Sequence, residues 1–225
     1  MSTQQLTPRM TAGGPGIGRA TGFELASPGQ PDAANVQAAL ERNRAFAAGG
    51  GHEGAVVFPR LSLFVITCLD PRTDPAHFLG LGLSDAMVLR NVGGRVTPEV
   101  INDVAFIGQL AENVLPDGPL FEVAMIHHTQ CGTGALADDT FRRRYAERIG
   151  AEESTLREHA VLDPAATVTR DVKRLRSAPA ISPRVTVSGH VYDVVTGLVQ
   201  TVIPACSSAD RTVEQPQIPR GDETP

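Results

Sequence analysis

The chain has 225 residues, of which 41% are hydrophobic and 20% are charged, and its formal net charge is -5 at pH 7. This length suits one sizeable α/β domain with tails, and its basic runs are too short to indicate a nucleic-acid-binding segment. No apolar run reaches the roughly 18 residues of a membrane span, and the N-terminus lacks the apolar core of a signal peptide. We therefore expect a cytoplasmic protein with no nucleic-acid partner and no membrane partner.

The N-terminal part of the sequence predicts a tail followed by one helix. Residues 1–32 are rich in polar residues, glycine and proline, and we expect them to be disordered. The glycine-rich run at 13–18 follows no strand, which argues against a phosphate-binding loop. From Asp32 to Ala48 apolar residues recur near helical spacing, and the glycines at 49–51 end the pattern.

Three short apolar runs predict buried strands of a parallel sheet, namely Leu61–Thr67, Ala86–Leu89 and Leu120–Ile126. Helices separate them, because Asp74-Pro75 and Thr97-Pro98 each place a capping side chain before a proline at the first helical position. The second of these helices carries an apolar stripe of Val100, Val104, Ile107, Ala111 and Val114. The alternation predicts an α/β fold with a mostly parallel central β-sheet flanked by helices.

The C-terminal half continues with helices and ends in a pair of strands. A polar helix is predicted from about Asp138, further helical patterns cover roughly 152–162 and 168–176, and the alternation at 184–202 indicates a hairpin. Residues 205–225 are polar and contain prolines, so we expect a second disordered tail. The predicted catalytic domain is therefore 33–204.

Two loops after predicted strands carry most of the reactive side chains. In an open parallel sheet, functional residues gather at the carboxyl ends of the strands. Cys68, Asp70 and Arg72 follow the first strand, whereas His128 and Cys131 follow the third. We therefore expect the two loops to converge on one site.

The residue types in these loops favour catalytic zinc. Two thiolates and one imidazole suit zinc, and three protein ligands leave the fourth tetrahedral position open for water. His128 is preferred over His127 because adjacent residues at a strand end point to opposite faces, and because the step from His128 to Cys131 matches a tight turn. Cys206 has no partner motif around it, and we interpret it as an incidental thiol.

Three motifs resemble those of a known family. CLDPR at 68–72 and HTQC at 128–131 are similar to the C-x-D-x-R and H-x-x-C signatures of β-class carbonic anhydrases, and RNVGG at 90–94 resembles that family's RNAGG turn. The similarity in element order extends from about residue 33 to 203. Gln130 departs from the pattern, since many relatives have an acid there.

The resemblance implies one zinc ion per chain, held by Cys68, His128 and Cys131. It also implies reversible hydration of carbon dioxide to bicarbonate and a proton, by attack of zinc-bound hydroxide. Asp70, held ionised by Arg72, would accept the hydrogen bond of that hydroxide and orient it. In some members of the family the equivalent aspartate moves onto zinc, so Asp70 is counted both as a catalytic residue and as a fourth metal ligand.

The resemblance further implies a homodimer or a higher homo-oligomer, often with the N-terminal helix laid across a partner subunit. Two other functions stay open at this point. The same zinc site serves carbonyl sulfide or carbon disulfide hydrolysis in some relatives. Alternatively, Cys68 and Cys131 form a regulatory disulfide in a non-catalytic zinc or thiol redox protein, although the Asp70 and Arg72 pair then has no explanation.

Overall fold

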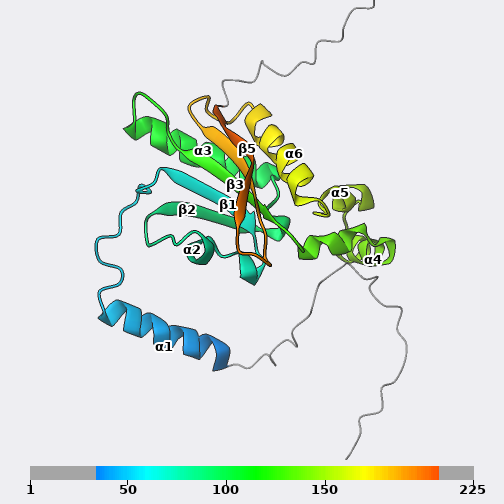
Figure 1. Cartoon of the computed structure of the whole chain (residues 1–225), viewed down its shortest axis with the longest axis horizontal. Coiled ribbons are helices and arrows are strands. Elements are labelled where there is room, and N and C mark those ends of the chain that lie inside the picture. The colour runs from blue at the N-terminus through cyan, green and yellow to red at the C-terminus, as the bar shows by residue number, and fades with distance from the viewer. Residues whose placement is uncertain (1–33, 208–225) are drawn as a thin grey trace, which may run out of the picture.

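A computed structural model describes residues 34–207 of the chain. The expected N-terminal tail, the glycine-rich run at 13–18 and the C-terminal residues from 208 lie outside the described residues. Five strands form one sheet in the order β2-β1-β3-β4-β5 (Figure 1). The strands are β1 (Leu63–Cys68), β2 (Ala86–Asn91), β3 (Glu122–His128), β4 (Thr186–Tyr192) and β5 (Val199–Ser207).

The first four strands are parallel, and β5 runs antiparallel to β4 at the edge of the sheet. This arrangement confirms the predicted mostly parallel α/β fold, including its C-terminal hairpin. The last strand extends to Ser207, three residues past the expected end of the catalytic domain. The difference arises because Pro204 suggests the end of a strand, whereas β5 lies at the edge of the sheet, where a proline is tolerated.

Within residues 34–207, helix α1 (Ala34–Ala48) precedes the sheet. The helices between strands are α2 (Pro75–Phe78), α3 (Pro98–Val114), α4 (Asp139–Ile149), α5 (Glu153–Glu158) and α6 (Pro164–Ser177). The predicted caps are present, since Asp74 accepts a hydrogen bond from the Ala76 amide and Thr97 accepts one from the Val100 amide. The helical pattern at 152–162 resolves into the short α5 alone, while α6 begins earlier than predicted because Asp163 caps it.

The core lies between one face of the sheet and helices α3 and α6. Alternate residues of the central strands point into it, and from the helices come Val100, Val104, Ala111, Val168, Val172 and Leu175. The predicted stripe of α3 therefore packs on the sheet as far as Ala111. Val114, in the last turn, is 55% exposed and lies outside this core.

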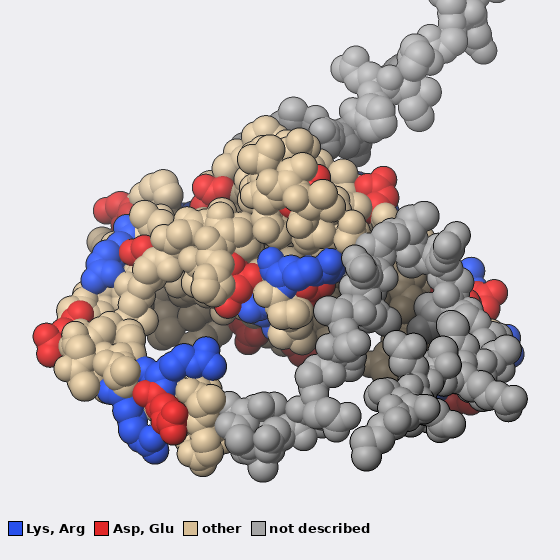
Figure 2. All heavy atoms as spheres, turned by 60° about the horizontal axis from the view of Figure 1, so that its bottom comes forward, with Lys and Arg blue, Asp and Glu red and all other residues tan. Residues whose placement is uncertain are grey.

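Helix α1 stands apart from the sheet, and residues 49–62 connect it to β1 (Figure 1). Its described side chains are all exposed, including Val36, Leu40 and Phe46. Acidic and basic residues are interspersed on the face shown in Figure 2 rather than separated into blocks. None of the helices within residues 34–207 combines the length and the hydrophobicity that crossing a bilayer requires.

Candidate metal centre

Two neighbouring strands bring the predicted metal ligands together. β1 and β3 pair in parallel, so their carboxyl ends lie side by side. Cys68 is the last residue of β1 and His128 the last residue of β3, while Cys131 follows in the next turn. The sulfur and nitrogen atoms of these three buried side chains all lie within 4.8 Å of one another.

The turn between His128 and Cys131 has a constrained backbone. Gln130 adopts a left-handed conformation with a φ of 55°, which is uncommon for a residue other than glycine. The Thr129 amide donates to the Tyr192 carbonyl on β4 at 3.0 Å and so attaches the turn to the sheet. This reversal directs Cys131 back towards the end of β1.

The arrangement of His128 fits a metal ligand. Its Nδ1 lies 2.9 Å from the Thr129 carbonyl oxygen, which can only accept a hydrogen bond, so Nδ1 must carry the proton. Nε2 then presents its lone pair, and this atom is buried without a hydrogen-bond partner among the described residues. Metal-binding histidines commonly donate their other ring N–H to a carbonyl in this way.

The two sulfur atoms are also spaced for zinc. Sγ of Cys68 lies 4.0 Å from Sγ of Cys131. With Zn–S bonds of about 2.3 Å in a tetrahedral site, the two sulfurs of a zinc pair lie roughly 3.8 Å apart. The donor set and its spacing therefore fit a zinc ion.

The paired thiols do not ionise alike. Hydrogen bonding with Cys131 outweighs burial and lowers the pKa of Cys68, whereas the same pairing, together with burial, raises the pKa of Cys131. A further contact links Cys131 to the Thr133 hydroxyl, with 3.1 Å between Sγ and Oγ1. One thiolate is thus favoured at neutral pH, and thiolate is the form that binds metal.

Asp70 and Arg72 form an ion pair beside these ligands. Arg72 donates from Nη2 to Oδ2 of Asp70 at 2.7 Å and from Nε to Oδ1 at 2.9 Å. Burial raises the pKa of Asp70, but the hydrogen bonds from Arg72 more than offset this, so the pKa ends below its ordinary value. Asp70 is not one of the three clustered ligands, because Arg72 engages both of its oxygens.

Gln130 connects the loop that carries Arg72 to the loop that carries His128 and Cys131. Its carbonyl oxygen accepts from Nη2 of Arg72 at 3.0 Å, and its side-chain oxygen lies 3.4 Å from Nη1. A neutral amide therefore stands where an acid would compete with Asp70 for Arg72. The sequence marks this residue only as a departure from the family pattern.

A buried network beneath the site was not predicted. Asp171, on α6, accepts from Nε of Arg95 at 2.6 Å and from the Val96 amide at 3.3 Å. Its Oδ2 also lies 3.5 Å from Nε2 of His127, the neighbour of the ligand His128. No motif surrounds Asp171, so only tertiary structure could show that it lies there.

The backbone of the RNVGG turn lies close to the backbone of Thr67 and Cys68 at the end of β1. Gly94 has a φ of 65°, and a Cβ added there would lie 3.0 Å from both the Cys68 amide nitrogen and the Thr67 carbonyl carbon. Arg90 donates to the carbonyl oxygens of Cys68 and Asp70 at 3.0 and 2.7 Å. The motif therefore supports the loop of Cys68 in addition to forming a turn.

The mostly parallel sheet and the buried Cys-His-Cys group at its carboxyl edge define an α/β protein with a side-chain group that could hold a metal ion. No protein-family model matches the chain. The chain is 29% identical to β-carbonic anhydrase 1 of Mycobacterium tuberculosis over 146 residues, which are 65% of this chain and 85% of the relative. It is 28% identical to a carbon disulfide hydrolase of Acidithiobacillus thiooxidans over 155 residues, which are 60% of this chain and 74% of that protein.

Among solved structures, the carbonic anhydrase of Streptococcus mutans matches with a TM-score of 0.63 and 29% identity, covering 74% of this chain and 96% of that one. These similarities agree with the sequence motifs and with the α/β fold. Together these findings support placing the chain with the β-class carbonic anhydrases.

Proposed function

We propose that residues 33–204 act as one catalytic domain that reversibly hydrates carbon dioxide to bicarbonate and a proton. The observation that carries this proposal is the buried group of Cys68, His128 and Cys131 with the Asp70 and Arg72 ion pair beside it. A zinc ion bound there would supply Lewis acidity, which lowers the pKa of a water molecule so that it reacts as hydroxide near neutral pH.

The side chains around the group have distinct roles in this proposal. Cys68, His128 and Cys131 hold one zinc ion per chain. The Asp70 carboxylate, kept ionised by Arg72, accepts a hydrogen bond from the reacting water and fixes its direction towards carbon dioxide. For Asp70 to act as a fourth metal ligand, it must first release the hydrogen bonds from Arg72, so the paired arrangement corresponds to the open form of the site.

The test compares two site variants with a matched cysteine control. Cys68→Ser should lose both zinc and hydration, because an alcohol is a poor substitute for a thiolate ligand. Asp70→Asn should retain zinc while its hydration rate falls about 100-fold or more. Cys206→Ser, which changes the thiol outside the group, should retain both properties. Zinc is measured by elemental analysis and hydration by stopped flow; full activity of Cys68→Ser would refute the proposal.

Carbon disulfide or carbonyl sulfide hydrolysis is the second candidate function, favoured by the similarity to carbon disulfide hydrolases. The same donor set and the same Asp70 serve it. Sulfide release, assayed in parallel with hydration, separates the two activities, and a higher kcat/KM for the sulfur substrate would replace the first proposal. Zinc-free protein with an intact Cys68–Cys131 disulfide and no turnover of either substrate would favour the thiol redox alternative.

We further propose that the chain forms a homodimer or a higher homo-oligomer. Support comes from α1, whose apolar side chains Val36, Leu40 and Phe46 are 62%, 44% and 46% exposed. A helix that leaves such residues exposed commonly finds its packing partner on another molecule.

A further inference from the structure

A cavity of about 660 Å³ is lined by Arg95, by residues between 157 and 163, and by residues of α6. It has a size typical of small-molecule binding sites. Four arginines contribute to its lining, namely Arg95, Arg157, Arg170 and Arg174. The proposed reaction at the metal centre uses none of them.

The arginines differ in how their charges are compensated. Arg95 is buried at the base of the cavity, where Asp171 neutralises it through a two-point ion pair. Arg157 contacts Asp139 on α4 at 3.2 Å. Arg170 and Arg174, in contrast, form no ion pair with a carboxylate among residues 34–207, and their hydrogen bonds go to Thr167 Oγ1 and to the Val96 carbonyl.

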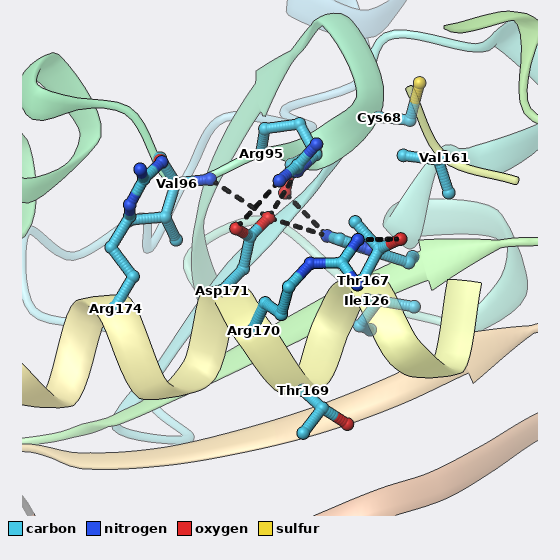
Figure 3. Close-up of polar contacts among 12 residues, drawn as sticks. Cys68, Arg95, Val96, Ile126, Val161, Thr167, Thr169, Arg170, Asp171 and Arg174 are labelled. Carbon is cyan, nitrogen blue, oxygen red and sulfur yellow. Dashed lines mark hydrogen bonds and ion pairs between the residues drawn. The ribbon is translucent and has the colours of Figure 1, made fainter. Parts of the chain in front are cut away.

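The two uncompensated guanidinium groups share one side of α6. They are four residues apart, which places them one helical turn from each other. Figure 3 shows Arg170 and Arg174 rising from the same side of the helix as Asp171, whereas Thr169 points away. Both side chains are exposed, so an incoming ligand can reach them.

Acidic residues line the cavity together with the arginines. Asp163 caps α6 by accepting from the Ala166 amide at 3.0 Å, and its carboxylate keeps its negative charge among the lining residues. Glu158, which also lines the cavity, is exposed and would accept hydrogen bonds from hydroxyl or amino groups. Burial lowers the pKa of His159, which lies between the lining residues Glu158 and Ala160, and the charge of Arg95 lowers it further.

We propose that this cavity binds a phosphorylated small molecule, with the phosphate held by Arg170 and Arg174. Guanidinium groups bind phosphate oxygens through paired charge-assisted hydrogen bonds, and arginine is preferred over lysine where that geometry is used. The remaining part of the ligand, bearing hydroxyl or amino donors, faces Glu158. This inference does not depend on which reaction the metal centre performs.

The test uses inorganic pyrophosphate as the probe and the full-length, zinc-loaded protein, with binding followed by titration calorimetry. The wild-type protein should bind it saturably with a Kd below about 1 mM. Arg170→Ala/Arg174→Ala should weaken binding at least tenfold, because each substitution removes a charge-assisted contact worth about tenfold or more.

The matched control is Arg144→Ala/Arg148→Ala, which removes two exposed arginines with the same four-residue spacing on α4. This variant should bind pyrophosphate like the wild type. Affinity of the wild type should also fall as sodium chloride is raised, since the contacts are between exposed charges. Absence of saturable binding of pyrophosphate by the wild type up to about 10 mM would overturn the proposal. Equal affinity of the wild type and the Arg170→Ala/Arg174→Ala variant would also overturn it, and would indicate that pyrophosphate binds at the metal instead.

Discussion

At the scale of single residues, Asp171 connects α6 to the layer beneath the metal centre. Its side chain is 2% exposed and that of its partner Arg95 is 5% exposed, so neither charge is well solvated. Removing one member of a buried ion pair leaves the other charge without compensation, which costs about 3–5 kcal/mol. The pair therefore stabilises the 94–96 segment only while both charges are present.

We predict that Asp171→Asn lowers the free energy of unfolding by about 3 kcal/mol or more, because Arg95 stays buried and loses its counter-charge. Urea unfolding near neutral pH measures the change. Asp103→Asn, on the exposed side of α3, serves as the matched control and should stay within about 0.5 kcal/mol of the wild type. An Asp171→Asn protein as stable as the control would show that the pair contributes nothing.

We also predict that the stability difference between the wild type and Asp171→Asn depends on pH. Burial raises the pKa of Asp171, but hydrogen bonds from His127 and Arg95 and the charge of Arg95 bring it below the ordinary value of 3.8. A carboxyl with a lowered pKa in the folded state stabilises the protein above its unfolded pKa and loses this contribution as the pH falls through the folded pKa. The stability difference between wild type and Asp171→Asn should therefore be full near neutral pH and shrink below about pH 4.

The sequence predicts the donor residues of the site better than the residues that support them. Cys68, His128 and Cys131 can be found because each lies at or just after the end of an apolar run, and the ends of parallel strands meet. Asp171 and Thr133 could not be found this way, since their roles depend on how α6 and the turn after β3 pack. The structure brings the three donor side chains together, while their binding of zinc stays a prediction.

At the scale of elements, the turn after β2 approaches the end of β1 closely enough to exclude a side chain at Gly94. We predict that Gly94→Ala destabilises the protein and weakens its affinity for zinc, because the added methyl group displaces the backbone at Thr67 and Cys68. The measurements are urea unfolding and competition with a zinc chelator.

Gly118→Ala provides the control for backbone strain alone. Gly118 also has a positive φ, of 79°, but an added Cβ would meet nothing within 4 Å. Its substitution should cost about 1–2 kcal/mol from the left-handed backbone without changing zinc affinity. Equal effects of the two alanine variants on both quantities would mean that the close approach at Gly94 is unimportant.

Elements with a strong local signal were predicted most accurately. α3 begins at the predicted Thr97-Pro98 because the capping side chain and the fixed φ of proline are local properties. The boundary between α5 and α6 was less accurate, since the 159–163 segment leaves the helical path and Val161 packs beside Cys68 and Cys131. That packing depends on residues distant in sequence.

At the scale of the whole molecule, α1 is the feature that the rest of the described chain does not cover. We predict a solution mass of at least twice the 23.8 kDa of one chain, measured by sedimentation or light scattering. Leu40→Glu/Phe46→Glu should reduce that mass, because charges on an apolar contact oppose association. Gln37→Glu, a polar position of the same helix, is the control; a single-chain mass for the wild type would contradict the oligomer.

The two thiols of the candidate metal centre are 63 residues apart in sequence and become neighbours because β1 pairs with β3. No short peptide of this chain contains the complete donor set, in contrast to zinc fingers, whose ligands lie close together and whose folding begins with the metal. During synthesis on the ribosome, the set is incomplete until Cys131 has emerged and long-range strand pairing is finished. An incoming ion would therefore complete the assembly of this protein rather than start it.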